Sequence, residues 1–118
     1  TNVHAVEAAL QSLPAPIRLI AGGRAKGDSL EILEPLVKEK VAAVYLIGEA
    51  AEAFAEFFQP MTEVHLELTL EDAVFHALHD GRSGESLLLS PACASWDMFK
   101  NYAERGDRFK KAVKEFES

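Results

Sequence analysis

The sequence predicts an α/β fold in which helices cover both faces of a mostly parallel β-sheet. Its strand candidates are continuous apolar runs at residues 17–23, 41–48 and 86–90, and segments with helical periodicity separate them. Continuous apolar runs are typical of strands buried on both faces, and strands that alternate with helices favour parallel pairing. The 118 residues suit one domain with its own core.

The expected elements alternate along the whole chain. In order, they are a helix at 3–13, a strand at 17–23, a helix at 30–39, a strand at 41–48, a helix at 50–58, a strand at 63–68, a helix at 70–81, a strand at 86–90 and a helical tail from residue 95. Neither an internal repeat nor a domain boundary is visible.

Caps, breakers and apolar spacing support these helices. In the first helix Val6 and Leu10 share one face, and Pro14 ends the pattern. Pro35 lies inside the second helical pattern, so we expect an irregular first turn there. Gly106 predicts a break in the tail, with Asp107 capping a second helix.

The middle of the chain is less regular. Phe54, Phe57 and Phe58 mark one face of the helix after residue 50, whereas residues 63–68 alternate only weakly between apolar and polar. The helix that follows is marked by Leu70 and ends near a glycine. The segment 63–68 is still predicted to be a strand, although its pattern is the weakest of the strand candidates.

Charge and cysteine content exclude several classes of function. Twelve basic and nineteen acidic residues give a net charge of -7, which argues against nucleic acid or an anionic membrane as a partner. No apolar run approaches the roughly 20 residues of a membrane span. The single cysteine, Cys93, cannot form an internal disulfide. The sequence thus predicts a cytoplasmic protein.

Two loops that follow predicted strands have unusual chemistry: "GGRAKGD" after the first strand and "SPACAS" after the last. In open α/β sheets ligands bind outside the carboxyl ends of the strands. Lys26 could hold a carboxylate or phosphate there, although most loop lysines are merely solvated. The loop lacks the spacing of a phosphate-binding P-loop.

Ser95 begins the helical tail after three small residues, 92–94. It can act as an N-cap, and the same helix start could bind a carboxylate through free backbone N–H groups. No nucleophile-elbow motif surrounds it. Trp96, Phe99 and Tyr102 recur at helical spacing, which favours packing on the core, although Tyr102 could also border a pocket.

No metal site is predicted. His76 and His79 lie one helical turn apart, but no third ligand is spaced to complete a site, so we interpret them as surface histidines.

Three segments resemble the members of the Mur ligase family that add D-glutamate. "LLLSPACASWDMFKNYAERGDRF" is similar to the C-terminal signature of that family, "TNVHAVEAAL" to the helix after its D-S-K-A-T-N motif, and "GGRAKGD" to its G-G-x-x-K loop. The resemblance covers essentially the whole chain. It implies a Rossmann-like C-terminal domain that binds D-glutamate and closes over the ATP site. The implied D-glutamate contacts are Thr1, Lys26, Ser95, Trp96 through its backbone, and Tyr102.

The family resemblance also implies an activity for the complete enzyme. With ATP and Mg, such ligases phosphorylate the carboxylate of UDP-N-acetylmuramoyl-L-alanine, and the D-glutamate amine then attacks the acyl phosphate during peptidoglycan synthesis. The sequence contains no G-K-[ST] phosphate loop. We therefore expect residues 1–118 to be a single C-terminal domain without the N-terminal and central ATP-binding domains. It would have no catalytic residue of its own and no activity in isolation.

Two other hypotheses remain open at this point. The chain could be a free-standing α/β module that binds a small anionic ligand without catalysis. It could also be a protein-interaction domain, which would expose an apolar patch and lack a cleft at Lys26 and Ser95.

Overall fold

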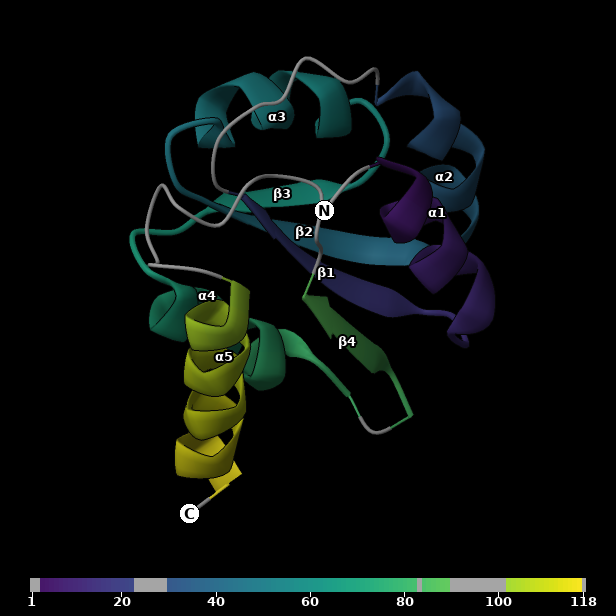
Figure 1. Ribbon diagram of the computed structural model, residues 1–118. Helices are drawn as coiled ribbons and strands as arrows, with labels where there is room; N and C mark the ends of the chain where they lie inside the picture. The colour runs from purple at the N-terminus through teal and green to yellow at the C-terminus, as the bar shows by residue number, and fades with distance from the viewer. Residues whose placement is uncertain (1–2, 23–29, 83, 90–101, 118) are drawn as a thin grey trace.

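The computed structural model describes residues 3–22, 30–82, 84–89 and 102–117 of the chain (Figure 1). Strands and helices alternate along it, as the sequence predicts. The elements are α1 (Val3–Ser12), β1 (Ile17–Gly22), the 3-10 helix η1 (Glu31–Leu33), α2 (Glu34–Lys40), β2 (Val41–Ile47), α3 (Ala51–Phe58), β3 (Glu63–Leu66), α4 (Leu70–Asp80), β4 (Ser86–Leu89) and α5 (Tyr102–Glu117).

The described strands form one parallel sheet in the order β3-β2-β1-β4. The crossovers through α2 and α3 add β2 and then β3 on one side of β1. The crossover through α4 returns across the sheet and adds β4 on the other side. The strand order therefore reverses beside β1. This arrangement confirms the predicted parallel α/β fold, because every described strand pairing is parallel.

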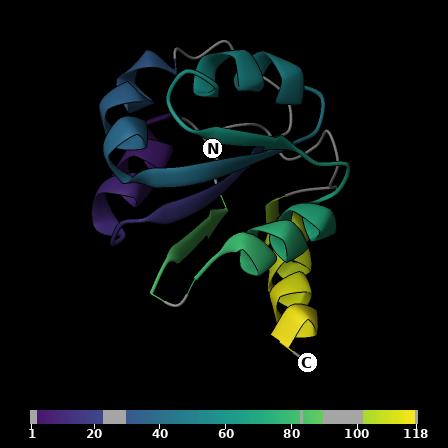
Figure 2. The same cartoon turned by 180° about the vertical axis from the view of Figure 1, so that it is seen from behind.

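Helices cover both faces of the sheet, as expected. Figures 1 and 2 show α1, α2 and α3 on one face and α4 and α5 on the other. The side chains of β2 divide accordingly: Val44 and Leu46 belong to the core beneath α1–α3, whereas Ala43, Tyr45 and Ile47 belong to the core beneath α4 and α5. Such burial on both faces explains why the sequence of β2 is a continuous apolar run.

The predicted elements are present within the described residues, and β2 ends at Ile47, one residue earlier than predicted. The strand expected at 63–68 ends at Leu66, and its burial is only partial, in keeping with its weak pattern. The irregular turn expected near Pro35 is confirmed: η1 precedes α2, and Pro35 lies in the first turn of α2. Proline fits there because a first-turn residue needs no intrahelical N–H donor.

The break predicted at Gly106 is wrong, because α5 continues without interruption through Gly106 and Asp107. A glycine inside a helix costs about 1 kcal/mol relative to alanine, which is not enough to end a helix that packs along another. Beyond the glycine, Ala112 is buried against α4, and Arg108 donates two hydrogen bonds to the Glu71 carboxylate at 2.9 and 2.7 Å. The predicted start of this helix at residue 95 lies outside the described residues.

Gly22 is the last residue of β1, and its lack of a side chain has a specific cause. A Cβ at this position would overlap the carbonyl oxygen of Ile47 and lie 2.6 Å from its Cγ1 atom. Ile47 is the register partner of Gly22 at the end of β2. The backbones of β1 and β2 therefore approach each other here at a distance that only glycine permits.

Replacing Gly22 with alanine should lower the free energy of unfolding by about 1–3 kcal/mol, because either strand must move to accept the new methyl group. Urea unfolding followed by circular dichroism measures the change. The control is Ala42→Ser, at an exposed position of β2, which should change stability by less than about 0.5 kcal/mol. Equal stability of the two variants would contradict the close approach.

Candidate functional site

The sequence-predicted site residues fall mainly outside the part of the chain that the structure describes. This holds for Thr1, Lys26, Ser95 and Trp96. Tyr102 is the first residue of α5, but its side chain is also outside the described set. The structure does describe the two strands from which the predicted loops depart, and these strands define the edge at which a ligand is expected.

β1 and β4 are hydrogen-bonded parallel neighbours, and Ile20 pairs with Leu89. Their carboxyl ends therefore meet at the same edge of the sheet. The segment 23–29 follows β1 directly in sequence, and the segment 90–101 follows β4. Since the strand order reverses between these two strands, their carboxyl ends form the switch point at which open α/β sheets bind ligands.

A polar network fixes the α4 face of the sheet. The Arg18 guanidinium of β1 donates from Nη1 to the Tyr45 hydroxyl at 2.9 Å and from Nε to Glu85 at 2.8 Å. The hydroxyl of Tyr45 in turn donates to Asp80 at the end of α4, at 3.0 Å. Tyr45 is fully buried, and its hydroxyl would be costly to leave without hydrogen-bond partners. The network supplies those partners.

The protonation states in this network follow from burial and pairing. Burial raises the pKa of Tyr45 to about 12, so the hydroxyl stays protonated. The pKa of Glu85 is lowered, chiefly by its hydrogen bond from Arg18. Burial alone would lower the pKa of Arg18, but the bonds to Glu85 and Tyr45 outweigh burial and raise it. The network therefore contains fixed charges and a neutral phenol at neutral pH.

One further aromatic contact extends this arrangement to β3. The rings of Tyr45 and His65 stack at a centroid distance of 4.8 Å and an interplanar angle of 8°. His65 Nε2 also lies 2.6 Å from the Glu63 carboxylate. Sequence reasoning missed this network, although Arg18 and Tyr45 interrupt otherwise apolar strands. A polar side chain inside such a run is a signal that it has a buried partner.

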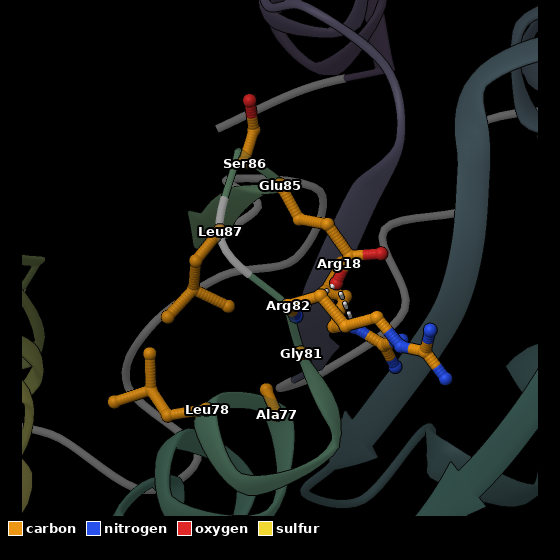
Figure 3. A pocket seen from close by; sticks show the side chains of 8 residues that line it. All are labelled: Arg18, Ala77, Leu78, Gly81, Arg82, Glu85, Ser86 and Leu87. Atoms are coloured by element: carbon orange, nitrogen blue, oxygen red, sulfur yellow. Dashed lines mark hydrogen bonds and ion pairs between the residues drawn. The ribbon is translucent and has the colours of Figure 1, made fainter.

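A pocket of about 210 Å³ lies beside the network (Figure 3). Its lining combines apolar and charged residues from β1, the end of α4, the connection between α4 and β4, and the start of β4: Arg18, Ala77, Leu78, Gly81, Arg82, Glu85, Ser86 and Leu87. These residues place it near the amino ends of β1 and β4, away from the carboxyl edge. Arg18 and Glu85 bind each other here, so their charges are already balanced. We therefore assign this pocket no ligand.

The histidines of α4 have carboxylate neighbours. His76 Nδ1 lies 2.7 Å from Glu67, and His79 Nδ1 lies 3.5 Å from Asp80. Within the described residues, no group of three or more His, Cys, Asp or Glu side chains could hold a metal ion. The helices in that part of the chain also include none that is long and apolar enough to cross a membrane.

Comparisons with known proteins identify close relatives. The chain is 44% identical over 115 residues to UDP-N-acetylmuramoylalanine–D-glutamate ligase of Chlorobium chlorochromatii, and 48% identical over 114 residues to the ligase of the same name from Citrifermentans bemidjiense. These matches cover 98% and 97% of this chain but only 25% of each relative. A scan against protein-family models gives no match.

The fold defines an α/β domain of the class that binds ligands at the carboxyl edge of an open parallel sheet. The matches to the ligases extend over nearly the whole chain, at an identity that random similarity does not reach. The chain therefore belongs to the family of UDP-N-acetylmuramoylalanine–D-glutamate ligases, within the Mur ligases that its motifs resemble, and spans about a quarter of their length.

Tyr45→Phe should lower the free energy of unfolding at pH 7 by about 1–3 kcal/mol, because it leaves a mostly buried guanidinium and Asp80 without their shared hydroxyl. Its pH dependence should also differ from that of the wild type. Since the folded-state pKa is about 12, above the usual 10, the stability that neutral Tyr45 contributes is complete below about pH 10 and declines as pH rises towards 12.

Denaturant unfolding at pH 7, 10 and 11 measures both effects. The wild type should lose stability over that range, and the loss should be smaller in Tyr45→Phe. Absorbance titration gives an independent readout: the folded wild type should show one tyrosine with a pKa near 12, whereas in denaturant both tyrosines should titrate near 10. Titration of both folded-state tyrosines near 10 would contradict the buried network.

Proposed function

We propose that this chain is the C-terminal, D-glutamate-binding domain of a bacterial cytoplasmic ligase. The complete enzyme would join D-glutamate to UDP-N-acetylmuramoyl-L-alanine in peptidoglycan synthesis, at the expense of ATP. The observation that carries the proposal is the 44–48% identity to UDP-N-acetylmuramoylalanine–D-glutamate ligases over nearly the whole chain. The chain covers a quarter of those relatives, which fits a domain of a larger enzyme better than a free-standing module.

The proposed D-glutamate site lies at the carboxyl ends of β1 and β4. Lys26 follows β1 by a few residues, and Ser95 follows β4 by a few residues. The pairing of Ile20 with Leu89 supports their convergence, because both loops start at one edge of the sheet. A pair of short loops from adjacent parallel strands can enclose a single small ligand.

The proposed residues suit an amino acid with two carboxylates. The Lys26 ammonium would balance one carboxylate, and the backbone N–H groups at Ser95 and Trp96 would bind another. Thr1 and Tyr102 would border the ligand. This arrangement leaves the amine of D-glutamate unbound, so that its lone pair can attack. A domain that holds both carboxylates fixes the direction of that attack.

In the proposed reaction, the carboxylate of UDP-N-acetylmuramoyl-L-alanine is activated as an acyl phosphate, with ATP as phosphoryl donor. The D-glutamate amine attacks the acyl carbon, the C–N bond forms, and a tetrahedral intermediate collapses with loss of phosphate and of the amine proton. Lys26 and Ser95 would orient the nucleophile throughout. They act by positioning, and we assign the proton transfer to no residue of this chain.

ATP and Mg are proposed to bind mainly to the rest of the enzyme. The chain has no G-K-[ST] sequence that could cradle a phosphate chain. The part of it that the structure describes contains no three-ligand group for a metal. We therefore derive no step from a metal bound to this chain.

D-Glutamate added to the 118-residue chain should shift backbone amide resonances in the segments around Lys26 and Ser95. Binding is expected to be weak, because the remainder of the enzyme would share the site. L-Glutamate at equal concentration is the matched control, and Lys26→Ala should weaken the response by about tenfold, the loss of one charge-assisted contact. Shifts confined to the pocket at Arg18 and Glu85 would count against the proposed site.

Supplied with ATP, Mg and both substrates, the 118-residue chain alone should form no amide product. The complete ligase that contains this domain should form it under the same conditions. Phosphate release and mass spectrometry of the product measure the difference. Amide formation by the isolated chain would overturn its assignment as one domain of a larger enzyme.

A further inference from the structure

A bidentate ion pair joins α5 to the first turn of α4. Arg108 donates from Nε to one carboxylate oxygen of Glu71 at 2.9 Å and from Nη2 to the other at 2.7 Å. Two parallel bonds from a planar guanidinium restrain angle as well as distance, which a single point contact does not do. The pair therefore restrains both the rotation of α5 about its axis and its position along α4.

Apolar packing contributes most of the energy of the contact between α4 and α5, which lie against each other (Figures 1 and 2). Ala112 is buried there, and Phe109 and Val113 pack beside it. The side chains of Glu71 and Arg108 remain 35% and 34% exposed, and ion pairs with that exposure add little to stability. Apolar packing is non-directional. The orientation that the pair imposes is therefore a larger effect than the energy it contributes.

Both partners are charged at neutral pH. The hydrogen bonds from Arg108 are the largest cause of the lowered pKa of Glu71, and they outweigh the opposing effect of burial. The carboxylate also lies in the first turn of α4, where the helix dipole favours a negative charge. The ion pair is therefore intact at neutral pH.

The helix that carries Glu71 is itself bonded to the sheet. Just before α4, the Glu67 N–H donates to the carbonyl of Leu46 in β2 at 2.8 Å. At the C-terminal end of α4, Asp80 accepts a hydrogen bond from the buried hydroxyl of Tyr45, also in β2. Glu71 is therefore presented to α5 from a helix that is fixed at both ends.

The continuity of α5 transmits this restraint to the first residue of the helix. α5 begins at Tyr102 and continues without a break through Gly106. Arg108 follows Tyr102 by six positions, which is about 9 Å along a helix axis. Because a helix of that length is rigid, a rotation or shift of α5 at Arg108 also moves its start. The segment 90–101 joins α5 at this start.

We propose that Glu71 and Arg108 are positioning residues for D-glutamate, whose ion pair holds the start of α5 in the orientation at which the ligand binds. This inference rests on the proposed function, which assigns Ser95, Trp96 and Tyr102 to the D-glutamate site. The first turn of α4 follows the carboxyl end of β3, so the pair lies at the same edge of the sheet as that site. Neither residue of the pair contacts the ligand, and both act through α5.

The test compares complete ligases that carry Arg108→Gln, Glu71→Gln or both substitutions. Each single variant should raise KM for D-glutamate about fivefold, because the ligand contacts next to α5 are displaced, and should leave KM for ATP unchanged. The double variant should be no worse than either single variant, since both substitutions remove the same pair of bonds. The matched control is Lys110→Ala, which removes an exposed cation from the same helix and should leave all KM values unchanged.

Arg108→Lys separates orientation from charge. Lysine keeps the positive charge but cannot form the two parallel bonds. We expect KM for D-glutamate to rise nearly as much as in Arg108→Gln, while the thermal midpoint of the 118-residue chain falls by less than about 5 °C. A wild-type KM in this variant would show that charge alone suffices, which overturns the positioning role.

The remaining outcomes also decide the matter. If the complete wild-type protein forms no amide from D-glutamate, the proposed function fails, and the positioning proposal fails with it. If the wild type is active but no substitution of the pair changes KM for D-glutamate, the positioning proposal alone is overturned. An equal rise of all KM values together with a large fall of the thermal midpoint would assign the pair a structural role only, which also contradicts the proposal.

Discussion

The parallel pairing of β1 with β2 on one side and β4 on the other is the constraint on which the rest of the structure depends. β1 occupies an interior position of the sheet, and the chain must cross the whole sheet through α4 to place β4 beside it. That crossing puts helices on both faces and reverses the strand order. It also brings together the carboxyl ends of two strands that are far apart in the sequence. Gly22 shows how closely this geometry is enforced, since no side chain fits between β1 and Ile47.

The α4 face is held by a different kind of interaction from the face beneath α1–α3. Aliphatic and aromatic side chains pack against the face beneath α1–α3. The α4 face also contains a series of side chains joined by hydrogen bonds: Glu85, Arg18, Tyr45 and Asp80. Hydrogen bonds require particular partners, so this series fixes the end of α4 against β1 and β2 in one orientation. Ordinary apolar packing would tolerate small shifts of the helix. The network thus stabilises a defined relation between α4 and the sheet.

This fixed relation leaves the two ends of α4 in different surroundings. The C-terminal end of α4 lies beside the pocket at the amino edge, where Arg18 and Glu85 bind each other. Its N-terminal end lies next to Leu66 and Leu68, where apolar side chains are exposed on a hydrogen-bonded segment. A polar pair thus marks the first end of α4, and exposed leucines mark the second.

The sequence by itself determined the elements and the class of fold. The continuous apolar runs of β1 and β2 required burial on both faces, and Pro35 required an irregular turn before α2; both follow from local sterics and periodicity. The sequence also identified Lys26 and Ser95 as candidate ligand-binding residues, mainly through motif resemblance, and that prediction concerns residues outside the described part of the chain.

The tertiary structure alone decided three things: the order β3-β2-β1-β4, the continuity of α5 through Gly106, and the partners of Arg18 and Tyr45. Each of these depends on contacts between distant segments. A glycine that locally disfavours a helix is overruled when residues such as Ala112 pack against α4, and no local pattern contains that energy.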